Sequence, residues 1–184
     1  TKADIDYEAV ALQVIREIGY QEEYHVMTKI AQQSLEITQA VAHDEISAGD
    51  QGIMFGYACN ETEALMPAPI YYAHKLTKAL SDYKKKDARF RPDGKSQVTV
   101  EYHDDVPIRV DTVVISTQHS DSVTLEQIRE DIKKHVILPI AGYMMDDETI
   151  IHVNPTGRFV IGGPAGDTGL TGRKIIVDTY GGYA

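Results

Sequence analysis

The chain has 184 residues, and its 28 acidic residues outnumber its 18 basic ones, which gives a formal net charge of −10 at pH 7. This balance excludes a general basic surface for nucleic acid. The single cysteine, Cys59, excludes a disulfide framework and a cysteine-based zinc site, and no apolar run approaches the length of a membrane span. We therefore expect a soluble, cytoplasmic protein with neither nucleic acid nor membrane as a partner.

Helical and extended patterns follow one another in the N-terminal half. Apolar residues recur at helical spacing over residues 6–18, where Asp6 can cap the first turn and Gly19 can end the helix. Residues 24–30 alternate in polarity, which predicts a strand. Residues 67–87 show the clearest helical spacing, so we expect a second helix there.

The C-terminal half is richer in extended segments. Residues 96–102 alternate and residues 108–116 are rich in β-branched side chains, so both are predicted strands. Residues 124–137 predict a helix, in which Thr124 and Gln127 are spaced as a capping box. The order of these elements favours an α+β fold over a regular βαβ winding. Three further short strands are expected at residues 149–153, 159–161 and 174–177.

Three loops combine glycine with charged residues, a mixture that can bind phosphate. The standard fingerprints are missing, because Arg89 stands where a P-loop needs glycine and no G-x-G-x-x-G follows a strand. The third loop holds five glycines within thirteen residues, and its acid and its two bases suit a phosphate chain with a metal or an amine nearby. Ordinary turn chemistry remains an alternative for the third loop and is favoured for the second. The loops are residues 48–52, 91–96 and 162–174.

Other polar residues favour ordinary surface roles. Residues 84–86 are three lysines at the end of a predicted helix, where cations favour the negative end of the helix dipole, so we expect a solvated charged end. Residues 146–148 are acidic and predict a solvated loop. The histidines do not cluster at metal-ligand spacing, and no G-x-S-x-G motif supports a serine nucleophile. Surface or turn positions are expected for His43, His103 and His119.

Six segments together resemble the S-adenosylmethionine synthetase (methionine adenosyltransferase) family, and the resemblance extends from about Asp4 to Ala184. It implies mixed sheets with helices packed on one face, in the family's repeated domains. It also implies a partial chain, because the family's earlier His-Pro-Asp-Lys segment has no counterpart here and the loop after Gln39 is short. On this basis residues 1–43 correspond to the end of the first domain, 44–157 to the middle domain and 158–184 to the start of the third. The matching segments are residues 49–58, 65–69, 91–99, 116–119, 154–164 and 166–182.

The resemblance implies formation of S-adenosylmethionine from ATP and L-methionine, with Mg²⁺ and K⁺ as cofactors whose ligands lie mostly outside this chain, so no metal ligand is assigned here. It implies a cytoplasmic homodimer with shared active sites, commonly assembled as a tetramer. The alternatives are a non-catalytic fragment that keeps only packing and subunit-interface roles, and a nucleotide-binding module for another substrate. The implied catalytic residues are Lys95, Asp167, Arg173 and Lys174. The implied ATP-binding residues are Asp50, Asp93, Lys95, Arg158, Phe159, Asp167, Arg173 and Lys174, and the implied methionine-binding residues are Gln39 and Asp167.

Overall fold

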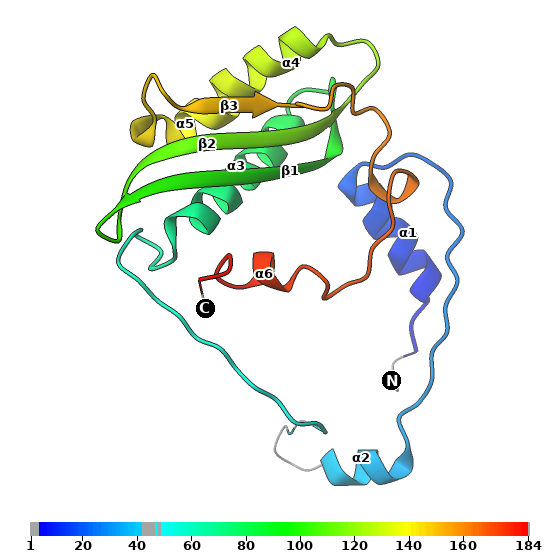
Figure 1. Cartoon of the computed structure of the whole chain (residues 1–184). Coiled ribbons are helices and arrows are strands. Elements are labelled where there is room, and N and C mark those ends of the chain that lie inside the picture. The colour runs from blue at the N-terminus through cyan, green and yellow to red at the C-terminus, as the bar shows by residue number, and fades with distance from the viewer. Residues whose placement is uncertain (1–3, 42–46, 48, 184) are drawn as a thin grey trace. The chain divides into compact units, whose positions relative to one another are not determined.

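A computed structural model describes residues 4–41, 47 and 49–183 (Figure 1). The chain divides into two compact units, Thr1–Phe55 and Gly56–Ala184. Each unit is described here by itself, and His43 lies outside the described residues.

The N-terminal unit contains two helices, α1 (Tyr7–Ile18) and α2 (Leu35–Val41). The predicted caps of α1 are confirmed: the Asp6 carboxylate accepts from the Ala9 amide at 2.9 Å, and Gly19 ends the helix with a φ of 114°. The strand predicted at residues 24–30 is wrong, because this segment has no regular structure. Alternation favours a strand only where a neighbouring strand supplies hydrogen bonds, and the described part of this unit holds none.

The second unit is built on a mixed three-stranded sheet in the order β1–β2–β3. Strands β1 (Phe90–His103) and β2 (Val106–His119) form an antiparallel hairpin, and β3 (Ile150–Val153) pairs with β2 in parallel. Two residues of positive φ, Asp104 and Asp105, make the tight turn between β1 and β2. The strands predicted at residues 96–102, 108–116 and 149–153 are therefore confirmed, and the first two are longer than expected.

Helices α3 (Ala68–Lys84) and α4 (Leu125–Ile132) confirm two of the predicted helices. Thr124 and Gln127 form the expected capping box at the start of α4. After α4 the helix becomes wider than an α-helix, because residues Lys133–Ile137 form a π-helical turn before the short helix α5 (Leu138–Ala141).

The helices pack on one face of the sheet (Figure 1). The Ser96 hydroxyl donates to the Ala73 carbonyl of α3 at 2.7 Å, so this residue and its alternate neighbours on β1 face the helices. Lys95 and Gln97 therefore face the opposite side of the sheet, and the α+β prediction with helices on one face is confirmed. The fully buried core includes Leu76, Leu80, Val110, Val113, Ile115, Ile128, Ile132, Val136 and Ile137.

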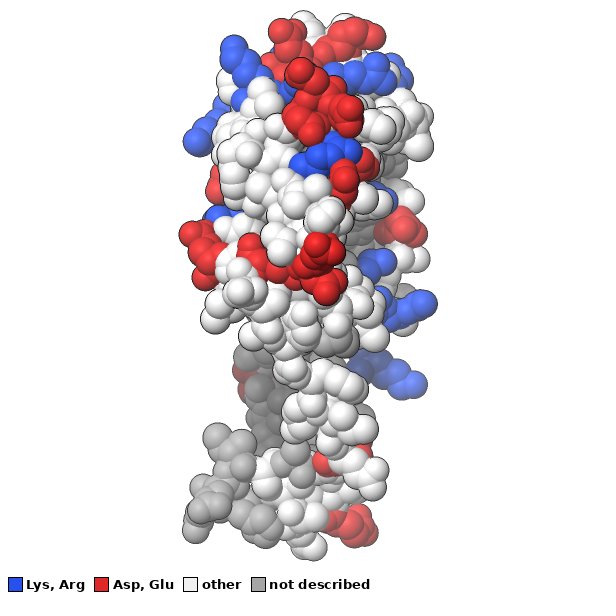
Figure 2. Space-filling view, turned by 60° about the vertical axis from the view of Figure 1, so that its left-hand side comes forward, with Lys and Arg blue, Asp and Glu red and all other residues white. Residues whose placement is uncertain are grey.

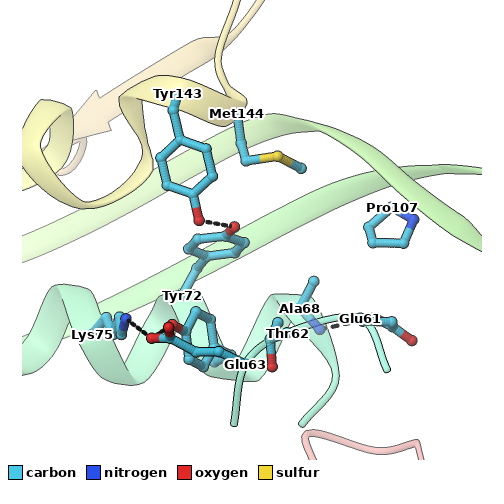
Figure 3. Close-up of a pocket in the computed structure, with 10 residues that line it drawn as sticks. Glu61, Thr62, Glu63, Ala68, Tyr72, Lys75, Pro107, Tyr143 and Met144 are labelled. Carbon is cyan, nitrogen blue, oxygen red and sulfur yellow. Dashed lines mark hydrogen bonds and ion pairs between the residues drawn. The ribbon is translucent and has the colours of Figure 1, made fainter. Parts of the chain in front are cut away.

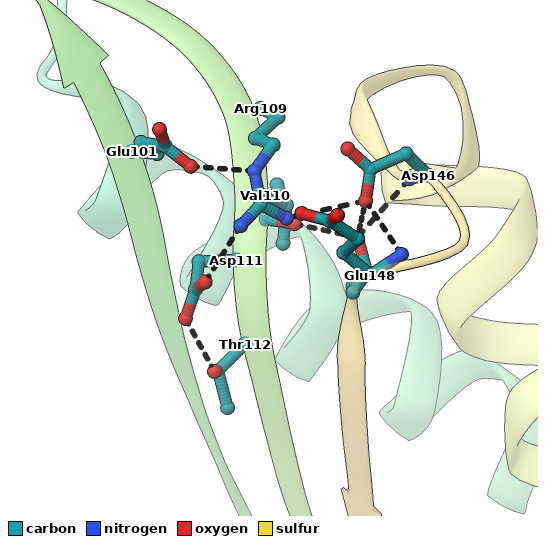
Figure 4. Close-up of polar contacts among 8 residues, drawn as sticks. Glu101, Arg109, Val110, Asp111, Thr112, Asp146 and Glu148 are labelled. Carbon is teal, nitrogen blue, oxygen red and sulfur yellow. Dashed lines mark hydrogen bonds and ion pairs between the residues drawn. The ribbon is translucent and has the colours of Figure 1, made fainter.

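The acidic loop before β3 is exposed as predicted, but it is also tied to the hairpin (Figure 4). Arg109 on β2 donates to the carboxylates of Glu101 at 2.5 Å, Asp111 at 2.9 Å and Asp146 at 3.1 Å. The Thr149 hydroxyl also donates to the Val110 carbonyl at 2.7 Å. One guanidinium thus holds three carboxylates from three segments together.

The C-terminal segment differs from the prediction. Residues 159–161 form no strand, and residues 174–177 do not either, because α6 (Ile175–Asp178) is one turn of helix closed by the Asp178 amide on the Lys174 carbonyl at 3.0 Å. Two short 3₁₀ turns, Gly142–Met144 and Gly163–Ala165, complete the unit. None of the helices in the described residues has the length and apolar character needed to cross a membrane. Acidic and basic side chains are intermixed on the face that Figure 2 shows.

Candidate functional site

The segment expected as a glycine-bearing turn at residues 91–96 is instead the first part of β1, so the turn prediction is wrong. The strand is irregular here: Phe90 pairs with His119 and Gly94 with Thr117, so four steps on β1 match two on β2. We call residues 91–93 the β1 bulge. A bulge of this kind redirects side chains and leaves main-chain groups outside the ladder, and its proline lacks the N–H that a regular ladder would use.

Asp93 joins this bulge to the segment that follows β3. Its carboxylate accepts from the Gly163 amide at 2.8 Å, while its own amide donates to the Gln118 side-chain oxygen at 3.2 Å. The Gln118 side-chain nitrogen then donates to the Val160 carbonyl at 2.9 Å. Gly162 lies against both side chains, since a β-carbon there would fall 2.8 Å from Gln118 and 3.0 Å from Asp93. Asp93 and Gln118 therefore fix the path of residues 160–163.

We call the contact between the β1 bulge, Gln118, His119 and residues 159–163 the junction. His119 is buried in it, so the surface position predicted for this residue is wrong. Its amide donates to the Phe159 carbonyl at 2.9 Å, and the Phe159 amide donates to its Nε2 at 3.0 Å. Since Nε2 accepts, the ring carries its hydrogen on Nδ1, which donates to the Ser120 carbonyl at 2.8 Å. Phe159 is thus paired in the manner of a strand, although the segment forms none. His103, by contrast, is exposed as predicted.

Lys84 departs from the predicted solvated end of the helix. It is partly buried, and its ammonium group donates to the main-chain carbonyls of Pro92 at 3.1 Å and Asp93 at 2.6 Å. Burial lowers the pKa of this ammonium to about 8, while the Asp93 carboxylate acts in the opposite direction. Lys85 and Lys86 are exposed, so the prediction is confirmed for these two lysines only.

Asn154 is a further buried residue to which the sequence assigned no role. Its amide donates to the Ile115 carbonyl at 2.9 Å, and its side chain pairs with both main-chain groups of Thr117, accepting from the N–H at 2.8 Å and donating to the carbonyl at 3.0 Å. Asn154 has a φ of 46°, a conformation that asparagine tolerates better than most residues. The side chain thus extends the sheet past the end of β3.

The structure brings some of the implied site residues together and leaves others apart. Asp93 and Phe159 both belong to the junction, where Asp93 binds Gly163 and Phe159 binds His119. Lys95 is exposed on the open face of the sheet, which is the face opposite the helices. Arg158 pairs with Asp121. In the described part of the chain, no hydrogen bond or ion pair links Lys95 to the glycine-rich loop. Asp167, Arg173 and Lys174 are exposed, and the Asp167 carboxylate accepts from the next residue's amide at 2.8 Å.

Two implied residues belong to the N-terminal unit. Gln39 lies on α2, and the Asp50 carboxylate accepts from the Gln51 amide at 2.7 Å. The roles of both residues in the site stay predictions.

The described residues do not form a metal site by themselves. No group of three or more His, Cys, Asp or Glu side chains in that part of the chain could hold an ion. The carboxylates of Asp93 and Asp167 each accept a main-chain N–H already. A carboxylate that accepts one N–H keeps further lone pairs, so each can supply an isolated ligand, but the described residues do not complete an Mg²⁺ or K⁺ site.

A separate hollow of about 430 Å³ lies at the start of α3 and is shown in Figure 3. Its carboxylates are satisfied within the chain: Glu63 accepts from Lys75 at 2.9 Å and from Tyr71 at 2.7 Å. The Tyr72 and Tyr143 hydroxyls lie 2.5 Å apart above it. None of the implied site residues lines this hollow. A smaller depression of about 110 Å³ is lined by Lys95, Ser96, Gln97, Val114 and Ser116.

The fold and the junction define an α+β domain that runs without a linker into a glycine-rich C-terminal segment. Residues 45–159 match the model of the S-adenosylmethionine synthetase central domain, and residues 161–184 match that of the S-adenosylmethionine synthetase C-terminal domain. The chain belongs to the S-adenosylmethionine synthetase family.

Proposed function

We propose that this chain is part of a methionine adenosyltransferase, which joins L-methionine to ATP. The methionine sulfur attacks the ribose C5′ with its lone pair, a carbon–sulfur bond forms, and the carbon–oxygen bond breaks so that triphosphate leaves with the electron pair. Water then cleaves the triphosphate to diphosphate and phosphate. A thioether carries no proton, so the attack needs no general base, and the demand falls on groups that stabilise the leaving oxygen.

The observation that carries this proposal is the hydrogen-bonded junction between the β1 bulge and residues 159–163. Asp93 lies near the middle of the central-domain match and Phe159 at its last residue, and Asp93 binds Gly163 near the start of the C-terminal match. His119 fixes the Phe159 main chain through two hydrogen bonds. An ordered junction of this kind provides the fixed positions that orient a nucleotide.

We assign the roles as follows. Lys95 stabilises the charge that develops on the triphosphate, and its exposed position on the open sheet face leaves it accessible. Phe159 stacks on adenine, and the Asp167 carboxylate binds the methionine ammonium. The remaining nucleotide contacts come from Asp50, Asp93, Arg158, Arg173 and Lys174, and Gln39 contacts methionine.

Mg²⁺ and K⁺ serve as cofactors in this family, and we propose that ligands mostly outside this chain hold them. We further propose a cytoplasmic homodimer with shared active sites, assembled further into a tetramer. The alternative is a non-catalytic piece of the enzyme that keeps only packing and interface roles, for which the exposed, unpaired positions of Arg173 and Lys174 in the described structure leave room.

Lys95→Ala tests the assignment. We expect kcat to fall by about 10²–10³, with a smaller change in the KM for ATP, because the lost interaction strengthens as charge moves to the leaving group. S-adenosylmethionine is measured by chromatography in the presence of ATP, L-methionine, Mg²⁺ and K⁺. Lys86→Ala, at an exposed lysine of the same chain, serves as the matched control. An unchanged kcat in Lys95→Ala would remove Lys95 from the site, and a folded wild type that makes no product would favour the non-catalytic alternative.

A further inference from the structure

Lys84 is the last residue of α3, yet its ammonium group is directed at β1. It donates to the carbonyls of Pro92 and Asp93 at 3.1 and 2.6 Å. These carbonyls belong to the β1 bulge, where the ladder to β2 is interrupted. A buried carbonyl without a donor destabilises the fold, so a bulge at this position requires a partner from another element. Lys84 is that partner.

The local packing leaves no room for a side chain on Gly94. A β-carbon on Gly94 would fall 2.7 Å from the Lys84 nitrogen and 3.1 Å from the Ser116 carbonyl of β2. The ammonium therefore sits between the end of α3 and the sheet, at the residue that separates Asp93 from Lys95. An interaction with the carbonyls at the end of α3, as the charge run suggested, is not what this lysine makes.

We propose that Lys84 is a positioning residue for the triphosphate site, because it fixes the main chain of the β1 bulge and through it the Asp93 carboxylate and the Lys95 amine. This inference rests on the proposed function of Asp93 and Lys95. The chain of contacts continues from the Lys84 ammonium to the Asp93 carbonyl, and from the Asp93 carboxylate to the Gly163 amide. Loosening the bulge therefore loosens residues 160–163 as well.

The positioning depends on protonation. Burial lowers the pKa of Lys84 to about 8, and the Asp93 carboxylate opposes that effect. A β-carbon on Gly94 would meet, besides the Lys84 ammonium, the apolar Leu80 of α3 and the neutral Ser116 carbonyl of β2, and neither carries a charge. A neutral amine keeps donors but loses the charge-assisted character of both hydrogen bonds, so the bulge is held less firmly as the pH rises through 8. The other charged side chains at this end of α3 are the exposed Asp82, Lys85 and Lys86.

The test compares three variants of the full chain. Lys84→Met removes the charge and the donors at similar length, Lys84→Arg keeps a charge that does not titrate below pH 12, and Lys86→Met is the matched control at an exposed neighbour. Amide exchange at Asp93 and Gly163 reports the junction without any ligand. Isothermal titration with tripolyphosphate in the presence of Mg²⁺ reports the site.

In Lys84→Met we expect the Gly163 amide to exchange at least about tenfold faster and tripolyphosphate to bind about tenfold more weakly, with Lys86→Met unchanged on both measures. In the wild type the Gly94 amide shift should titrate near pH 8, and tripolyphosphate affinity should fall between pH 7 and 9. In Lys84→Arg that titration should disappear. The wild-type titration needs no variant, so it decides the matter even if Lys84→Met does not fold.

The two levels of the inference fail separately. If the wild type does not bind tripolyphosphate, the assigned phosphate site is wrong and Lys84 has no role in it, whatever the exchange rates show. If the wild type binds but Lys84→Met binds equally well, the proposed function stands and the positioning role of Lys84 is wrong. A Gly94 amide shift that does not change between pH 7 and 9 overturns the proposed pH dependence of this role.

Discussion

Replacing Asn154 tests whether one side chain continues the sheet beyond β3. In Asn154→Ala the N–H and the carbonyl of Thr117 both lose their partners, and both residues are almost fully buried, at 0 and 1% exposure. A buried polar group left without a partner costs about 1–3 kcal/mol. Two such groups give an expected loss of about 2–6 kcal/mol, a large part of the roughly 5–15 kcal/mol that holds a typical domain together.

The backbone contributes separately and can be resolved by a second variant. Asn154 has a φ of 46°, which alanine tolerates poorly and glycine tolerates well. Asn154→Gly loses the same two hydrogen bonds but avoids the strain that alanine has at this φ. Its loss of unfolding free energy should therefore be smaller than that of Asn154→Ala by up to about 1–2 kcal/mol. Asn60→Ala, at the other asparagine of the chain and exposed, should leave stability within about 0.5 kcal/mol of the wild type.

The assay is urea unfolding followed by circular dichroism, with the midpoint and the slope fitted together. Asn154→Asp adds a pH test, since an ionised carboxylate can accept from the Thr117 amide but cannot donate to its carbonyl. The neutral acid can donate, so the pKa of the introduced carboxyl is expected to be raised in the folded state. The deficit should therefore be largest at pH 7 and shrink as the pH falls towards 4. A loss below about 1 kcal/mol in Asn154→Ala would refute the reasoning.

Two further substitutions address the junction and the ion-pair cluster. Gly162→Ala should destabilise the unit by about 1–3 kcal/mol, because its methyl would lie 2.8 Å from Gln118; urea unfolding measures this, and Gly142→Ala, whose nearest neighbour is 3.7 Å away, should cost far less. Arg109→Met should lower the melting temperature most at neutral pH: despite some desolvation, hydrogen bonds and Arg109 hold the pKa of Asp146 below its ordinary value, so this stabilisation is present above the unfolded pKa and is lost on acidification. A melting-temperature difference between wild type and Arg109→Met that does not shrink by pH 3 contradicts this account.

Local signals in the sequence were sufficient for the three longest α-helices, α1, α3 and α4, and for the two long strands, but not for the short helices α2, α5 and α6. Capping groups such as Asp6 and Thr124 lie within three residues of the amides they bind, so the sequence contains both partners side by side. The segments at residues 24–30 and 174–177 were wrongly predicted as strands, because a strand depends on a neighbour that the sequence pattern alone does not supply. Whether β-branched residues form a strand or a helical turn was decided by the surroundings.

The candidate site shows the same difference between what local sequence signals predict and what depends on the surroundings. Asp93 and Phe159 were found by resemblance, and the structure places both at the junction, but the roles of the site residues stay predictions. Gln118 and His119 were passed over or misjudged because their partners lie far along the chain; Gln118, for example, binds a carbonyl 42 residues away. Lys84 was misjudged because its partners, although near in the sequence, belong to a bulge that the sequence pattern did not reveal. A run of lysines in a sequence predicts solvated side chains, because the sequence does not show that the carbonyls of a bulge lie beside one of them.

The junction also limits how freely the two matched domains can be exchanged between related proteins. The border between the two family matches falls at residue 160, whose carbonyl accepts from Gln118, and three residues later the chain is bound by Asp93. The border thus lies inside a shared hydrogen-bond network and not in a free connector. A chimera that exchanges the C-terminal segment at this border would separate donors from acceptors, so recombination here succeeds only when residues 93 and 118 are inherited together with the segment they hold.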